Sequence, residues 1–87
     1  MPIRVRLPAM LGGGELAVTE RVETIAQLVG ALDRVRPGVA AQLRDTIFNF
    51  AVNDEMLLHD VNEHSLKDGD VVEIVPAISG GSFQPRG

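Results

Sequence analysis

Residues 66–81 read LKDGDVVEIVPAISGG, and this stretch places a turn, a strand and a tail in immediate succession. The turn is predicted at Asp68–Asp70, because aspartate and glycine favour tight reversals of the chain. The apolar run Val71–Val75 predicts a strand, which Pro76 is expected to end because proline has no N–H to donate to a neighbouring strand. From composition alone, the glycines that follow indicate a frayed terminus more readily than a functional tail.

Two strands are predicted near the start of the chain. Apolar and polar residues alternate over residues 3–8 and resume the alternation over 15–19, which is typical of strands with one buried face. The glycine run at 12–14 separates them and predicts a hairpin.

The longest predicted element is a helix that begins after Thr24. Thr24 and Gln27 have the spacing of a capping box, in which each side chain accepts a hydrogen bond from the other residue's backbone N–H. Pro37-Gly38 is expected to end the helix. Its apolar residues fall on one helical stripe, which comprises Ile25, Leu28, Val29, Leu32 and Val35.

Shorter elements are predicted between this helix and residue 66. Residues 39–43 predict one further helical turn, 47–52 a strand, and 56–58 a short strand. Asn53-Asp54 predicts the turn between the two strands. The pattern leaves open which side of the 47–52 strand is buried, the set Phe48, Phe50 and Val52 or the set Ile47, Asn49 and Ala51.

The order of the elements predicts an α+β domain, with a mixed sheet of four to five strands and one main helix on one face. Because one helix cannot cover both faces, we expect the other face to be open to partner proteins. Arg4 and Arg6 share one face of the first strand, and a solvated face is favoured over a docking patch for them.

The composition excludes several classes of function. The 87 residues include no cysteine, which rules out disulfides, thiol nucleophiles and cysteine-bound metals. Twelve acidic side chains against eight basic ones argue against nucleic-acid binding. The chain has no apolar run near the roughly 20 residues that span a membrane, and no signal peptide, so we expect a single cytoplasmic domain.

Few residues suit catalysis or metal binding. No serine has the spacing of a nucleophile elbow, and the two histidines are five residues apart in a polar stretch that favours a loop over a metal site. The glycine run at 12–14 lacks the lysine of a phosphate-binding loop, and Asp68–Asp70 lacks the spacing of a calcium loop. We therefore predict no catalytic residue and no metal site. The serines of the chain are Ser65, Ser79 and Ser82, and its histidines are His59 and His64.

Residues 66–81 closely resemble the C-terminal signature of the MoaD/ThiS-type sulfur carriers, which are ubiquitin-like proteins with a β-grasp fold. The helix led by Thr24, the Pro37–Val39 segment followed by Leu43, and the stretch FAVNDE at 50–55 are also similar, so the resemblance covers residues 3–81. The opening at 3–8 and the stretch at 52–55 look most like the CysO-type branch, whereas the Phe-Ala opening usual in small subunits of molybdopterin synthase is missing.

The resemblance implies that Gly81 is the reactive residue. In this family an activating enzyme adenylates the terminal glycine with ATP and magnesium, the acyl adenylate becomes a thiocarboxylate, and the sulfur passes to a biosynthetic enzyme. Gly80 and Ser79 would thread the tail into these enzymes, because glycine has no Cβ to obstruct a narrow site. The chain would bind no cofactor itself and would be a co-substrate, without catalytic residues.

This chain departs from the simplest members of the family by continuing for six residues after Gly81. We therefore expect a β-grasp domain at 1–76, a tail at 77–81 and an extension at 82–87. The bond between Gly81 and Ser82 is the predicted processing site, which a JAMM-type peptidase would cleave. The alternative is that the extension was added to the natural sequence.

Three other functions stay open at this stage. The chain could be the small subunit of molybdopterin synthase, a ubiquitin-like modifier that joins Gly81 to a lysine, or a binding module that keeps its tail. The pathway that takes the sulfur also stays open between cysteine synthesis, a secondary metabolite pathway and thiamine synthesis.

Overall fold

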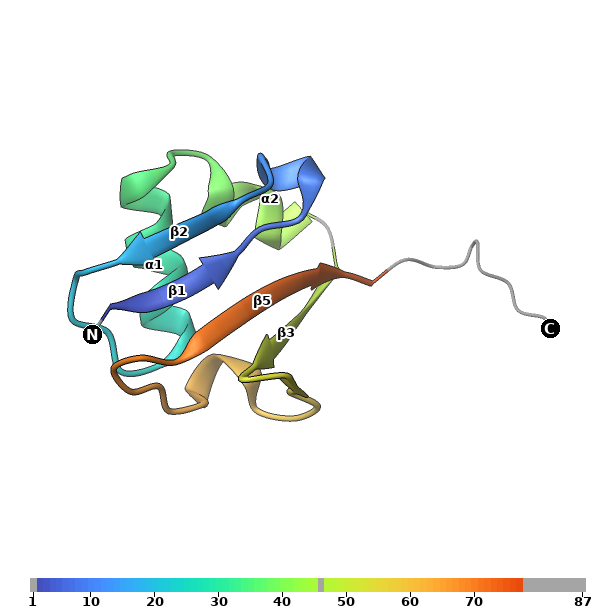
Figure 1. The fold of residues 1–87 in the computed structure, drawn as a ribbon. Helices are drawn as coiled ribbons and strands as arrows, with labels where there is room; N and C mark the ends of the chain where they lie inside the picture. The colour runs from blue at the N-terminus through green and yellow to red at the C-terminus, as the bar shows by residue number, and fades with distance from the viewer. Residues whose placement is uncertain (1, 46, 78–87) are drawn as a thin grey trace, which may run out of the picture.

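The computed structural model describes residues 2–45 and 47–77, which form a mixed five-stranded sheet with helix α1 packed on one face (Figure 1). The strand order is β2-β1-β5-β3-β4, in which β1 and β5 run parallel and the other neighbouring pairs run antiparallel. The strands are β1 Ile3–Arg6, β2 Glu15–Val18, β3 Phe48–Val52, β4 Glu55–Met56 and β5 Val71–Pro76. The helices are α1 Ile25–Val35 and α2 Val39–Asp45, with 3-10 turns η1 Ala9–Leu11 and η2 Val61–Glu63.

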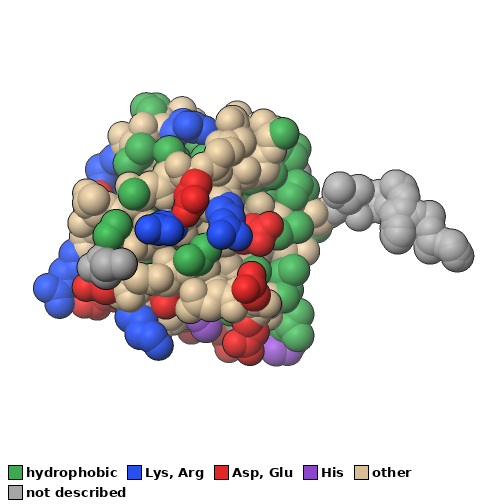
Figure 2. All heavy atoms as spheres, viewed as in Figure 1, with side chains coloured by type: hydrophobic (Ala, Val, Ile, Leu, Met, Phe, Trp, Pro, Cys, Tyr) green, Lys and Arg blue, Asp and Glu red, His purple; other side chains and the backbone are tan. Residues whose placement is uncertain are grey.

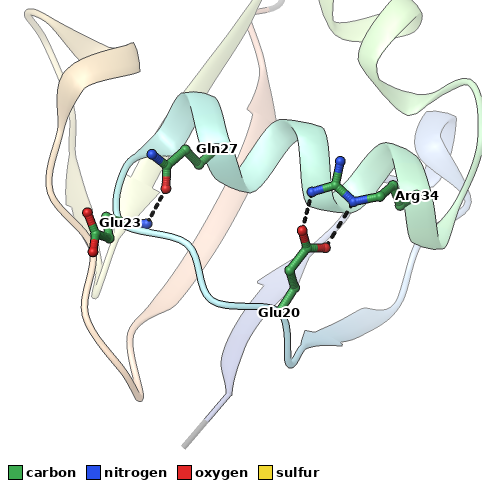
Figure 3. A network of polar contacts seen from close by, with 4 residues as sticks. All are labelled: Glu20, Glu23, Gln27 and Arg34. Carbon is green, nitrogen blue, oxygen red and sulfur yellow. Dashed lines mark hydrogen bonds and ion pairs between the residues drawn. The ribbon is translucent and has the colours of Figure 1, made fainter.

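The predicted cap of α1 forms, except that the Gln27 side chain bonds to Glu23 and not to Thr24 (Figure 3). Thr24 Oγ1 accepts a hydrogen bond from the Gln27 N–H at 3.3 Å, as expected. Gln27 Oε1 accepts from the Glu23 N–H at 2.8 Å rather than from the N–H of Thr24. Thr24 also forms a β-bridge with Ser65.

A second polar contact holds the loop before α1 against the helix (Figure 3). Arg34 Nε donates to Glu20 Oε1 at 3.0 Å, and Arg34 Nη2 donates to Glu20 Oε2. The hydrogen bond and the negative charge of Glu20 raise the pKa of Arg34 above its ordinary value. Both groups are exposed, so the pair adds little to stability.

Helix α1 buries most of its predicted stripe against the sheet. Ile25, Leu28 and Leu32 are fully buried, and Val29 packs against the core. The prediction is wrong for Val35, which is 54% exposed. Val35 is the last residue of α1, and the buried face of the helix ends one turn earlier at Leu32.

The structure decides which side of β3 is buried. Phe50 and Val52 belong to the hydrophobic core and Phe48 packs against it, whereas Ile47 and Asn49 are exposed. The aromatic set therefore faces α1. Because side chains alternate along a strand, the Asn49 and Ala51 side of β3 belongs to the outer face of the sheet.

Strand β5 includes Pro76, although proline was expected to end it. Pro76 lies opposite Phe48, and the Ala77 N–H donates to the Ile47 carbonyl at 3.0 Å. This bond shows that Phe48 and Pro76 form a non-hydrogen-bonded pair, in which the missing N–H of proline removes no bond of the ladder. The strand therefore continues to the last residue before Ala77.

The two predicted turns, Asn53-Asp54 and Asp68–Asp70, are joined by a polar clamp. Asp70 is only 6% exposed, and its carboxylate accepts from Asn53 Nδ2 and from the Lys67 N–H, both at 3.0 Å. Asn53 Oδ1 in turn accepts from the Val71 N–H at 2.9 Å. The clamp fixes the start of β5 and therefore the direction in which the strand runs.

Candidate functional site

The predicted site residues Ser79, Gly80, Gly81 and Ser82 lie outside the described residues, which end at Ala77. The described part of the site is the surface around the end of β5, where the chain leaves the sheet (Figure 1).

The end of β5 is paired with β3 on one side and is unpaired on the β1 side. Pairing with β1 ends at the Arg6–Glu73 pair, whereas pairing with β3 continues to Pro76. Pro8 follows β1 and has no N–H with which to continue the ladder. The unpaired side borders a small hollow of about 140 Å³, and its lining residues include Arg6, Pro8, Glu73, Val75 and Pro76.

The outer face of the sheet divides into a charged half and an apolar half. The register places five side chains in one row, namely Glu15, Arg6, Glu73, Ala51 and Met56 from β2 to β4. On the β1–β2 half, charges of opposite sign alternate, and Arg4 Nε lies 3.9 Å from Glu15 Oε2. Figure 2 shows this mixture of basic and acidic side chains over β1, β2 and β5.

The apolar half carries four residues, which we call the apolar flank. They are Ile47, Met56, Leu58 and Val75. Ile47 is 74% exposed, Leu58 77% and Met56 44%, while Val75 is half-buried opposite Asn49. Figure 2 shows hydrophobic side chains gathered along the side of the molecule on which β3 and the end of β5 lie.

Backbone pairing explains why Leu58 is exposed. The Leu57 N–H donates to the Phe50 carbonyl at 2.8 Å, so the chain stays beside β3 past the end of β4. Leu57 packs against the core, and its neighbour Leu58 therefore points to the other side. The sequence prediction treated 56–58 only as a strand, and the signal for an exposed leucine was the adjacent pair Leu57-Leu58, of which a half-buried strand can bury only one.

Elsewhere in the described residues there is no cluster suited to a metal ion, and the larger hollow lies away from the end of β5. No group of three or more His, Asp or Glu side chains within residues 2–45 and 47–77 is placed to hold a metal ion. A larger hollow of about 800 Å³ is lined by residues such as Ile3, Val18 and Lys67, at the end of β1 opposite to the Arg6–Glu73 pair. No helix of the described part of the chain is long and apolar enough to cross a membrane.

Three solved structures resemble the chain over nearly its full length. A chain of the Amycolatopsis orientalis BexX/CysO complex is 30% identical, with a TM-score of 0.72 over 91% of this chain and 99% of that one. Mycobacterium tuberculosis CysO, an antigen, is 26% identical, with a TM-score of 0.72 over 87% and 99% of the two chains. In the Helicobacter pylori 26695 complex of molybdopterin-converting factor subunits 1 and 2, a chain is 25% identical, with a TM-score of 0.63 over 93% and 100%.

The predicted β-grasp, ubiquitin-like fold is thereby confirmed, and the neighbours match the CysO-like branch. The model of the ThiS family matches residues 7–81, so the chain belongs to the ThiS family, a family of small sulfur carriers. Comparison with the curated proteins finds no significant match.

Proposed function

We propose that this chain carries sulfur as a thiocarboxylate on Gly81 and acts as a substrate of partner enzymes. The observation that carries the proposal is the extent of the family match, which includes Gly81 and stops there although the sequence continues to Gly87. The fold supports it, because β5 runs to Pro76 and leaves only a short segment before Gly81.

The proposed chemistry needs a free carboxylate on Gly81. A carboxylate oxygen attacks the α-phosphorus of ATP, the bond to pyrophosphate breaks, and an acyl adenylate forms. A hydrosulfide ion then attacks the acyl carbon, the carbon–oxygen bond to AMP breaks, and loss of the proton on sulfur leaves the thiocarboxylate. ATP and the magnesium that neutralises its phosphates belong to the activating enzyme, and the carrier holds no cofactor.

The tail suits this chemistry because its last two residues are glycines. Gly80 and Gly81 have no Cβ, so the backbone can enter a narrow site and the acyl carbon is unhindered. Ser79 is small enough to follow them.

The extension at 82–87 has to be removed before Gly81 can react. A peptidase of the metal-dependent JAMM type would add water across the bond between Gly81 and Ser82, leaving the carboxylate on the glycine. The chain of residues 1–87 is then a proform, and the sulfur chemistry depends on its trimming.

The resemblance to CysO favours delivery of sulfur to an acceptor of the CysO type, in cysteine synthesis or a secondary metabolite pathway. The BexX/CysO complex shows a similar protein in association with a partner, and we propose the same of this chain. A second candidate function is that of a small subunit in molybdopterin synthesis. It is supported by the similarity to a chain of the Helicobacter pylori complex, whose TM-score of 0.63 is lower than those of the two CysO structures.

Adenylation of two forms of the chain tests the proposal. The adenylating enzyme is purified from the source cells by following the exchange of labelled pyrophosphate into ATP. The activity to follow is the part of this exchange that depends on the added chain of residues 1–81. That chain keeps every core residue, since the core lies between Ile3 and Ile74. We expect exchange with 1–81 and none with 1–87. Absence of exchange with 1–81 in all fractions contradicts the carrier function, and equal exchange with both forms contradicts the requirement for trimming.

A further inference from the structure

We infer that the placement of the basic side chains keeps the activated acyl group of Gly81 from reacting with a side-chain amine of its own chain. Arginines, which are not nucleophilic, lie within reach of this acyl group, and the only lysine lies at the other end of the sheet. The inference rests on the proposed function, because it concerns the activated form of Gly81. Its test uses no enzyme, so the two can fail separately.

A lysine close to the activated acyl group would consume the carrier. The neutral amine attacks the acyl carbon, the bond from that carbon to the AMP oxygen breaks, and the nitrogen loses a proton. The product is an amide, which hydrosulfide does not open. A guanidinium stays protonated in proteins and does not react in this way. The type of basic residue near Gly81 therefore matters for the proposed reaction, although lysine and arginine carry the same charge.

The reach of the acyl group follows from the length of the chain after Ala77. Gly81 is four residues further on, and four extended residues span at most about 14 Å. An extended lysine side chain adds about 6 Å between its Cα and its Nζ. An amine can therefore meet the acyl carbon only if the Cα of its residue lies within about 20 Å of Ala77.

Two exposed positions within this reach are occupied by arginine. Arg6 pairs with Glu73, which is four residues before Ala77. The rise along a strand and the spacing between strands place the Arg6 Cα about 14 Å from that of Ala77. Arg6 also lines the small hollow at the end of β5. Arg44 lies three residues before Ile47, whose carbonyl accepts the Ala77 N–H. The Arg44 Cα is therefore at most about 17 Å from that of Ala77.

Lys67 is the only lysine of the chain, and it lies at the end of the sheet where β5 begins (Figure 1). The Asp70 N–H donates to the Lys67 carbonyl at 3.1 Å, and Lys67 lines the larger hollow together with Pro2 and Ile3, at the start of β1. Because β1 and β5 run parallel, both strands start at this end. Asp70 is seven residues before Ala77, which corresponds to about 23 Å along the strand and exceeds the reach of the acyl group.

Thioesters of the 1–81 chain test the inference. A C-terminal thioester with mercaptoethanesulfonate stands in for the acyl adenylate, because an amine that attacks its acyl carbon displaces the thiolate in the same way. Arg6→Lys and Arg44→Lys each place an amine within reach. Arg21→Lys is the matched control, since the Arg21 side chain is 92% exposed and lines the larger hollow at the far end. All three variants keep the charge at an exposed position, so we expect the wild-type circular dichroism spectrum.

We expect the thioesters of the wild type and of Arg21→Lys to hydrolyse to the free acid. In Arg6→Lys and Arg44→Lys, loss of the thioester should be at least about threefold faster, because the amine and the acyl carbon belong to one chain. The product should be a cyclic amide, lighter than the free acid by one molecule of water and formed at a rate independent of protein concentration. Peptide mass spectrometry should place the amide at the introduced lysine.

Three results would overturn the inference. Absence of the cyclic amide in both Arg6→Lys and Arg44→Lys shows that arginine at these positions protects nothing. Equal amounts of cyclic amide in the wild type or in Arg21→Lys show that the distant amines are reached as well. An amide that joins two chains as the main product, at a rate that rises with concentration, shows that capture occurs between copies. None of these results bears on adenylation of the wild-type 1–81 chain, which tests the carrier function itself.

Discussion

The two ends of β5 differ in how the rest of the molecule holds them. At its start, the buried Asp70 carboxylate accepts hydrogen bonds from the Asn53 side chain and the Lys67 N–H, and the Asn53 side chain accepts one from the Val71 N–H. At its end, the last bond of the described chain is one backbone contact between Ala77 and Ile47, whose side chain is exposed. One strand thus connects a region that stabilises the fold with the end that is nearest to Gly81 in the sequence, and changes at the two ends should have separable effects.

The largest expected effect is on reactivity at the tail end. Gly81→Ala in the 1–81 chain places a methyl group beside the acyl carbon, in a segment that has to enter a narrow site. We expect kcat/KM for adenylation to fall at least about a hundredfold, which corresponds to about 2.7 kcal/mol. Urea unfolding should give the wild-type midpoint, since Gly81 follows the core residues. Wild-type adenylation by this variant would remove Gly81 from the site.

A change at the start of β5 should have the opposite signature. Asp70→Ala removes the acceptor for Asn53 Nδ2 and the Lys67 N–H in a buried position. We expect the free energy of unfolding to fall by about 2–3 kcal/mol in urea titrations, because buried donors lose their partner. Asp70→Asn keeps one acceptor oxygen and should lose less. Under conditions where the variant is folded, adenylation should proceed at the wild-type kcat, and a large loss of kcat would show that the clamp acts on the site.

A smaller loss of stability is expected at the cap of α1. Thr24 forms a β-bridge with Ser65, and Ser65 belongs to the segment that precedes β5. Thr24→Ala leaves the Gln27 N–H without its side-chain acceptor, which should lower the free energy of unfolding by about 1 kcal/mol. Thr24→Ser keeps the hydroxyl and serves as the control. Equal unfolding midpoints for Thr24→Ala and the wild type would show that water replaces the cap.

The smallest effect is expected on the charged half of the outer face. Arg4→Gln breaks the pair with Glu15, which is partly exposed. We expect a change in unfolding free energy of no more than about 0.5 kcal/mol and a carrier KM within about twofold of wild type. A tenfold rise in KM would show that Arg4 contacts the adenylating enzyme.

Much of the fold could be predicted from the sequence because it depends on local periodicity. The alternation around Ile3 and Val5, the stripe of α1 and the glycine-containing turns each predict one element, and their order restricts the sheet. The errors fall at element ends. Val35 lies past the buried face of its helix, and Pro76 is tolerated in β5 because of a register that pairs it with Phe48.

The candidate site was less predictable, for a physical reason. Gly81 was predicted as the reactive residue only because residues 66–81 resemble the signature of a family, since two glycines by themselves also fit a frayed end. The exposure of Ile47 and Leu58 depends on how β3 pairs with β5 and with the chain after β4, which are contacts between distant parts of the sequence. The adjacent pair Leu57-Leu58 indicates that one leucine is exposed but not which one, and no local pattern indicates the exposure of Ile47.

Whether Gly81 carries sulfur is tested most directly by the intact mass of the protein isolated from its native cells. We expect a species that ends at Gly81 and in which one carboxylate oxygen is replaced by sulfur. That species should disappear when the adenylating enzyme is deleted, leaving the oxygen form. A chain that ends at Gly87 in cells containing both the peptidase and the adenylating enzyme would contradict the account.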